Sequence, residues 1–139
     1  MPGKGDQFEA IKGVQKLDGS PADIEHDGTV MLVDFWATWC PPCQAPMAHN
    51  QKMLEEHPEW AGKVRIIGVS LDQGLDAINQ RVNDKGWGKV EHYWRHQNDL
   101  QSWGFSGIPH VALIDKSGKI IEKGHPASIK LEELIIANL

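Results

Sequence analysis

The chain has 139 residues, a formal net charge of −5 and 24% charged residues, which fits one globular domain of mildly acidic character. It has no lysine- and arginine-rich block interleaved with aromatic residues, which argues against nucleic acid or an anionic membrane surface as the main partner. No apolar run approaches the roughly 18 residues that span a membrane, and no signal-peptide stretch opens the sequence. We therefore expect a soluble monomer, cytoplasmic as written, or periplasmic or otherwise exported if a leader precedes Met1.

The first half of the chain predicts a hairpin followed by a buried strand. Residues 1–7 are expected to be flexible, and apolar residues with turn signals over residues 8–29 indicate a peripheral hairpin. Residues 30–34 predict a strand, because the apolar run of residues 30–33 is typical of a strand covered on both faces. We place this strand at the centre of a sheet.

The two cysteines, Cys40 and Cys43, follow this strand at C-x-x-C spacing, with Pro41 and Pro42 between them. Proline suits the first turn of a helix, where its missing N–H costs little. Cys40 would then lie at a helix N-terminus, where free amides and the helix dipole favour a thiolate. A lone C-x-x-C beside a strand-helix-strand pattern favours redox chemistry over a pair of structural thiols.

The helix after the cysteines is expected to carry a kink at Pro46 and to stop near His57. A β-branched run over residues 64–69 predicts a second buried strand. Apolar spacing over residues 75–82 predicts a helix, and Gly86 would form its left-handed C-terminal cap.

The second half predicts a short strand near Tyr93, a brief helix over residues 98–103, and a hairpin of strands 111–114 and 119–122. A final amphipathic helix follows, with Ser128 as its candidate N-cap. This order predicts a single α/β domain over residues 1–139, with a mixed sheet and helices on both faces.

Three blocks of the sequence resemble the thioredoxin superfamily: residues 33–43, residues 107–109 and residues 114–119. The segment at residues 69–72 and the insertion that follows it look like the TlpA-like thiol-disulfide reductases, with tryparedoxin and nucleoredoxin as neighbours. The resemblance covers residues 8–139. It implies a thioredoxin-like fold in which a central mixed sheet is flanked by helices, with an N-terminal hairpin and a central insertion.

By this resemblance, Cys40 is the nucleophile, Cys43 the resolving cysteine and Pro109 a cis-proline facing them. A cis bond would leave the Ile108 backbone open to pair with an extended substrate as an added strand. Asp34 matches the buried acid of many thioredoxins, and it could take the proton of the second cysteine through a water if burial raises its pKa.

Other residues around the motif have two readings. Trp39 and Pro41 are expected to contact substrate, and Trp36 is expected to be core. His110 could reach the rim of the site or simply start a strand, whereas His49 is expected to be exposed.

Two positions depart from the family pattern. The helix proline stands at position 46 rather than 48, and Gln44 replaces the basic residue that often follows the motif, removing one source of thiolate stabilisation.

The sequence therefore predicts a thiol-disulfide oxidoreductase that reduces protein or small-molecule disulfides and receives electrons from an upstream thiol donor. No cofactor is expected beyond the Cys40–Cys43 pair itself. A peptide-binding module or chaperone without redox turnover is the alternative from another class. A copper or zinc site is a third reading, but only His49, His110 or Asp34 could join the cysteines, so we expect no metal.

Overall fold

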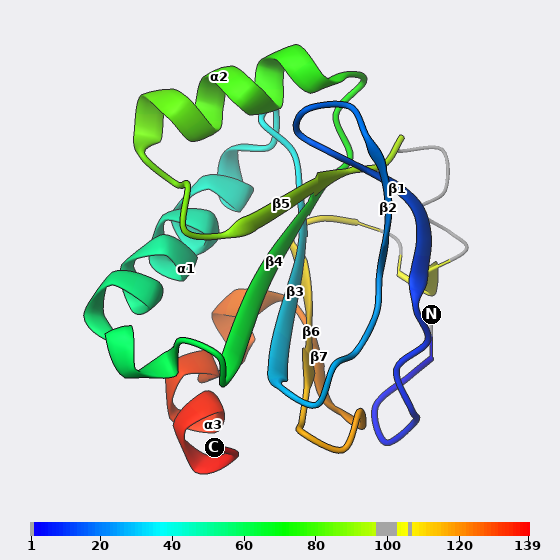
Figure 1. Cartoon of the computed structure of the whole chain (residues 1–139), viewed down its shortest axis with the longest axis vertical. Helices are drawn as coiled ribbons and strands as arrows, with labels where there is room; N and C mark the ends of the chain where they lie inside the picture. Colours follow the sequence, from blue (N-terminus) through cyan, green and yellow to red (C-terminus); the bar gives the residue numbers. More distant parts are fainter. Residues whose placement is uncertain (1, 97–102, 106) are drawn as a thin grey trace.

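The computed structural model describes residues 2–96, 103–105 and 107–139, and over these ranges seven strands form one mixed sheet (Figure 1). Across the sheet the strands follow the order β2 (Pro21–Ile24), β1 (Ile11–Lys16), β5 (Glu91–Trp94), β4 (Val64–Ser70), β3 (Val30–Trp36), β6 (His110–Ile114) and β7 (Ile120–Gly124). β3, β4 and β5 are parallel, and the remaining neighbours are antiparallel. The predicted mixed sheet, N-terminal hairpin and C-terminal strand pair are confirmed.

Strand β3 lies at the centre of the molecule, and every one of its residues is buried. Burial of every residue shows that both faces of this strand are covered. β3 pairs in parallel with β4 and antiparallel with β6, which sets Asp34 opposite Gly68 on one side and Val111 on the other. Its C-terminal end leads directly into the segment that carries the cysteines.

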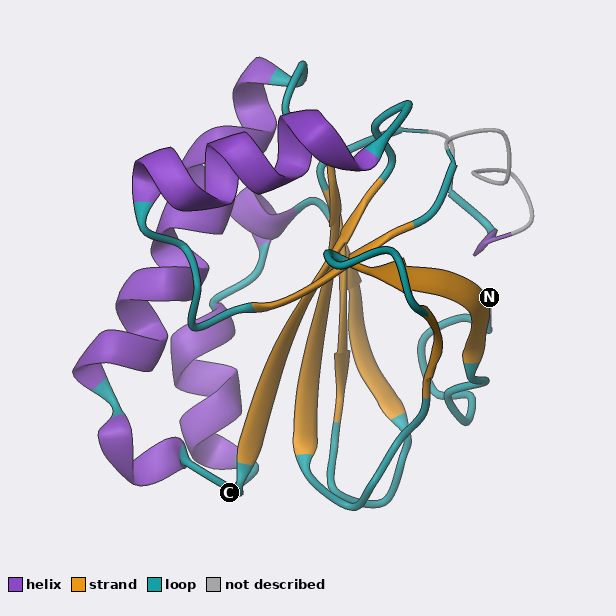
Figure 2. Cartoon of the chain, turned by 45° about the horizontal axis from the view of Figure 1, so that its top comes forward, coloured by secondary structure: helices purple, strands orange, loops and turns teal. Residues whose placement is uncertain are grey.

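The helices α1 (Gln44–Glu56), α2 (Leu75–Lys85) and α3 (Leu131–Ala137) pack on one face of the sheet, as Figure 2 shows. Their buried side chains join the even-numbered residues of β3 in one core. The opposite face is covered by the β1–β2 hairpin and by aromatic side chains from Phe8, Trp103 and Phe105. Among the described residues, a hairpin and aromatic rings close this second face. The helix predicted over residues 98–103 lies almost wholly outside the described residues, so helices on both faces stay a prediction.

The segment after Cys40 begins as a short 3-10 helix, η1 (Pro41–Cys43), and continues as α1. The α-helix itself starts at Gln44, so Pro46 is its third residue. In this first turn the backbone N–H groups have no partner within the helix, so a proline removes no helical hydrogen bond. The predicted kink rests on a helix that starts near Pro41 or Pro42, and the α-helix starts later, at Gln44. The predicted end near His57 is confirmed.

The remaining described elements follow the predictions with one change, at the start of the last helix. Gly86 ends α2 in the left-handed conformation, at φ 71°, as expected. Ser128 does not cap the last helix: it lies in the short 3-10 helix η4 (Pro126–Ser128), and Lys130 occupies the N-cap of α3.

The N-terminal segment, predicted to be flexible over residues 1–7, contacts the C-terminal strand pair. The N–H of Gly5 donates to the carbonyl of Ile120 at 2.8 Å, and Gln7 forms an isolated antiparallel bridge with Lys119. These contacts hold residues 5–7 against β7.

Candidate active site

Cys40 and Cys43 form a disulfide at the junction of β3 and α1. Cys40 is the N-cap of η1, with extended backbone angles, so the predicted place at a helix start is correct. Cys43 is completely buried, and Cys40 keeps only 4% of its surface exposed. Cys40 is thus the more exposed residue of the pair, which favours it as the position where an external disulfide would react.

The loop before β6 closes over this sulfur. The peptide bond between Ile108 and Pro109 is cis, as the resemblance implied. Cys40 Sγ lies 3.8 Å from the carbonyl oxygen of Ile108, so two segments about 68 residues apart in sequence meet at the disulfide. Pro109 is buried while Ile108 is half-buried. The structure thus brings together Cys40, Cys43, Ile108 and Pro109 as the sequence predicted.

Asp34 is completely buried on the helix-covered face of β3. Burial raises the pKa of its carboxyl to about 7, against the opposing effect of a hydrogen bond from Asn50. Asn50 Nδ2 donates to Asp34 Oδ2 at 2.8 Å, and Asp34 Oδ1 has no partner among the described residues. Asn50 lies seven residues after Cys43, which is two helical turns along the same buried face of α1.

A second buried carboxylate, Asp72, holds the segment that precedes the disulfide. It accepts hydrogen bonds from the backbone N–H of Thr38 at 3.0 Å, from the Thr38 hydroxyl at 2.6 Å and from the Ser70 hydroxyl at 2.6 Å. Asp72 follows the end of β4, next to the point where β3 ends. It therefore fixes the turn that aims Cys40, a role that sequence reasoning did not assign.

The side chain of Gln44 also holds this turn, through hydrogen bonds to its backbone carbonyls. Its amide nitrogen donates to the carbonyl of Cys40 at 2.8 Å and to the carbonyl of Ala37 at 3.1 Å. Its amide oxygen accepts from the guanidinium of Arg81 on α2. Gln44 replaces the basic residue that often follows the motif, and Arg81 brings a positive charge next to this position through its hydrogen bond with Gln44.

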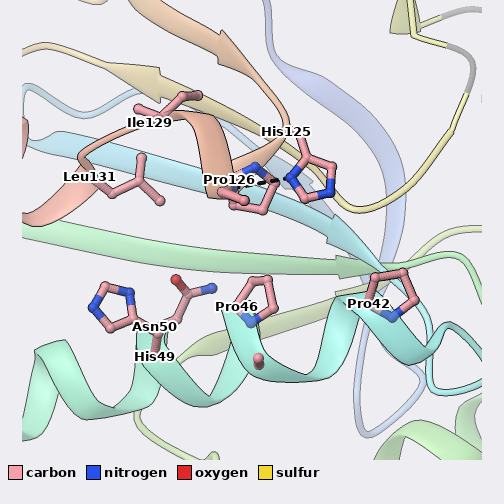
Figure 3. A pocket seen from close by; sticks show the side chains of 10 residues that line it. Pro42, Pro46, His49, Asn50, His125, Pro126, Ile129 and Leu131 are labelled. Atoms are coloured by element: carbon pink, nitrogen blue, oxygen red, sulfur yellow. Dashed lines mark hydrogen bonds between the residues drawn. The ribbon is translucent and has the colours of Figure 1, made fainter.

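The surface around the disulfide is apolar. Trp39 is 56% exposed, and Pro41 and Pro42 are exposed beside it. A cleft of about 360 Å³ opens between the start of α1 and the segment from η4 to α3, and Figure 3 shows it. Its walls are Pro42, Ala45, Pro46, His49, Asn50, His125, Pro126, Ala127, Ile129 and Leu131. Since Asn50 also bonds Asp34, this cleft comes within one side chain of the buried acid.

His110 points away from the disulfide. His110 starts β6, and its ring stacks on Phe105 at 4.2 Å between centroids, on the face away from the helices. Burial lowers its pKa to about 4. His49 is exposed as predicted, and Trp36 is fully buried in the core. Across the described part of the chain, no three His, Cys, Asp or Glu side chains gather as a metal site would require.

Sequence reasoning missed Asn50, Asp72 and the partner of Gln44. The heptad interval from Cys43 to Asn50 and the Ser70-x-Asp72 pattern after a strand were the available signals. Arg81 offers no local signal, because its contact with Gln44 joins residues 37 apart. No helix in the described ranges has the length and apolar character that crossing a membrane demands.

Comparisons with known proteins agree with this geometry. A thiol-disulfide oxidoreductase named ResA, from Bacillus thuringiensis (strain Al Hakam), is 30% identical over 112 residues, which cover 79% of this chain and 63% of that protein. The chain thus spans less than two thirds of the length of this relative.

Solved structures show the same fold. The thioredoxin domain of a thiol-disulfide oxidoreductase from Bacteroides vulgatus matches with a TM-score of 0.74 and 25% identity, covering 88% of this chain and 89% of that one. A thiol:disulfide interchange protein from Chlorobium tepidum TLS also gives 0.74, at 20% identity and 99% coverage of both chains. The family model described as thioredoxin-like matches residues 28–120, which is more than half of the chain. The chain therefore belongs to the thioredoxin-like family.

Proposed function

We propose that this protein is a thiol-disulfide oxidoreductase that reduces the disulfides of protein partners. The observation that carries this function is the Cys40–Cys43 disulfide at a helix start, with Cys40 Sγ against the Ile108 carbonyl and exposed apolar residues around it. The names of the similar proteins, which include thiol-disulfide oxidoreductases and an interchange protein, support the same chemistry.

The reaction follows from the unequal places of the two sulfurs. The reduced Cys40 thiolate attacks one sulfur of the partner disulfide, and the other partner sulfur leaves as a thiol after it gains a proton. Cys43 then loses its proton and attacks the sulfur of Cys40, which releases the second partner thiol and re-forms the Cys40–Cys43 disulfide. Two electrons pass to the partner, an upstream thiol donor restores the pair, and no further cofactor enters.

Asp34 is the proposed acceptor of the Cys43 proton. A group with a pKa near 7 can both take and return a proton at neutral pH, which is the property of an efficient general base. Its hydrogen bond with Asn50 attaches the carboxyl to the helix face that also carries Cys43. Trp39, Pro41 and the Ile108–Pro109 segment are the proposed contacts for the partner chain.

Insulin reduction with dithiothreitol as the electron donor tests this function. The wild-type protein should accelerate precipitation of the insulin B chain, and Cys40→Ser should give only the uncatalysed rate. Cys43→Ser is the matched control, because it keeps Cys40 and should accumulate a mixed disulfide visible on a non-reducing gel. Equal rates for Cys40→Ser and wild type would overturn the proposal and favour a binding module.

A further inference from the structure

A groove on the side of α1 opposite the apolar cleft carries positive charge. We call it the α1–α2 groove; it has a volume of about 440 Å³ and is lined by Gln44, Ala45, Ala48, Arg81, Lys85 and Trp87. It begins at the residue directly after Cys43. In Figure 1, α2 lies across the N-terminal end of α1, which brings the two walls of the groove together.

The two walls differ in character. α1 contributes the short side chains of Ala45 and Ala48, which leave the groove open, while α2 contributes Arg81 and Lys85. These cations are four residues apart, so they lie one above the other on the same helix face. No residue that lines the groove carries a carboxylate, although the whole chain has a net charge of −5.

Contacts within the protein explain only part of why Arg81 and Lys85 lie at this groove. Lys85 lies in the last turn of α2, where a cation complements the helix dipole, and Asp84 beside it does not line the groove. Arg81 donates to Gln44, yet a guanidinium has five N–H donors, so most remain available for an anion. The Lys85 side chain is exposed.

The groove is continuous with the surface around the disulfide. Ala45 lines both the α1–α2 groove and the apolar cleft, so the first turn of α1 separates two hollows: the cleft reaches Pro42 of the motif, and the groove begins at Gln44, directly after the motif. A partner that contacts Trp39 and Pro41 while its cysteine reaches Cys40 can extend its neighbouring residues over this turn. Those that lie toward α2 meet two cations, for which carboxylate side chains are the complementary group.

We propose that the α1–α2 groove binds an acidic segment of the protein partner whose disulfide Cys40 reduces. This inference rests on the proposed function and names a preference within it. Gln44 gives the groove a direct connection to the motif, because the same amide holds Arg81 and the carbonyl of Cys40. The preference weakens with salt, since the groove is open to solvent.

Three disulfide peptides of equal length, whose flanks carry three Glu, three Gln or three Lys residues, test the proposal. We expect kcat/KM to be about fivefold higher for the Glu peptide than for the Gln peptide at low salt, the size that two exposed ion pairs provide. The order should be Glu, Gln, Lys, and the differences should shrink at high salt. Equal values for the three peptides would overturn the proposal.

Two charge-reversal variants test whether the preference for the Glu peptide arises at the α1–α2 groove. Lys85→Glu should remove or reverse the Glu preference, while its matched control Lys116→Glu, in the exposed turn between β6 and β7, should retain it. A preference that survives in Lys85→Glu would place the recognition elsewhere and refute the assignment to this groove.

A redox-independent measurement separates this proposal from the proposed function. If no peptide is reduced, the function fails, and the groove is then judged by NMR titration of the oxidised protein with the Glu peptide carrying Ser in place of Cys. Amide shifts concentrated at Arg81, Lys85 and Gln44 support binding at the groove. Shifts that are absent, or equal with the Gln peptide, would contradict it.

Discussion

Replacing Asp34 by Asn should stabilise the protein at high pH. In the unfolded chain this carboxyl ionises near its ordinary pKa of 3.8, whereas burial raises the native value to about 7. Between these pH values the native protein holds a proton that the unfolded chain has lost. Stability therefore falls as pH rises through this window, and the full loss is present above pH 7.

The size of the effect follows from the same two pKa values. At 1.36 kcal/mol per pKa unit, the shift from 3.8 to about 7 corresponds to a loss of about 4 kcal/mol in the free energy of unfolding at alkaline pH. Asn cannot ionise, and its carbonyl oxygen can still accept from Asn50. Asp34→Asn should therefore escape this loss, and its advantage over wild type should grow by about 3 kcal/mol from pH 5 to pH 8.5.

Urea unfolding of the oxidised proteins across this pH range measures the difference, because the disulfide removes thiol titration from both. The matched control is Asp84→Asn, the same exchange on the exposed surface of α2, which leaves the buried Asp34 carboxyl in place and should therefore keep the wild-type loss of stability at high pH. A wild-type minus Asp34→Asn difference that is flat from pH 5 to pH 8.5 would show that the carboxyl is not held protonated by burial.

Two further predictions concern the residues around the motif. Asp72→Ala leaves the half-buried donors of Thr38 and the buried hydroxyl of Ser70 without this acceptor, so urea unfolding should show a loss of about 3 kcal/mol in the free energy of unfolding, and an unchanged midpoint would contradict this role. A methyl group at Gly68 would lie 3.0 Å from Met47 Cε and 3.2 Å from Trp36 Nε1, so Gly68→Ala should cost about 1–3 kcal/mol by thermal unfolding. Gly88→Ala, which meets open space, is its control.

The parts of the site that are close in sequence could be predicted from it. The C-x-x-C spacing, the prolines and the apolar run before them place Cys40 at a helix start, because each of these signals acts within a few residues. The Ile108–Pro109 segment was found only through its resemblance to a family. Its contact with Cys40 depends on the pairing of β3 with β6, which periodicity alone does not reveal.

The parts that depend on packing between elements could not be predicted. His110 follows Pro109 directly, yet strand alternation turns its side chain to the far face, where it stacks on Phe105. Pro46 was expected to disturb a helix whose true start is at Gln44. The supply of a cation to Gln44 from Arg81 needs the position of α2 over α1, which no local pattern contains.

Strand β3 imposes a constraint on how this protein can change. Asp34 and Trp36 face the helices, while Val33 and Phe35 face the second core. Along the seven residues of this strand, successive side chains alternate between the helix-covered face and the opposite face of the sheet. An insertion or deletion of a single residue here would exchange them, burying the acid among the aromatic rings and presenting a phenyl ring to the helices. Length variation should therefore be tolerated in the loop before this strand, but neither within the strand nor in the turn after it, which Asp72 and Gln44 hold in place around Cys40.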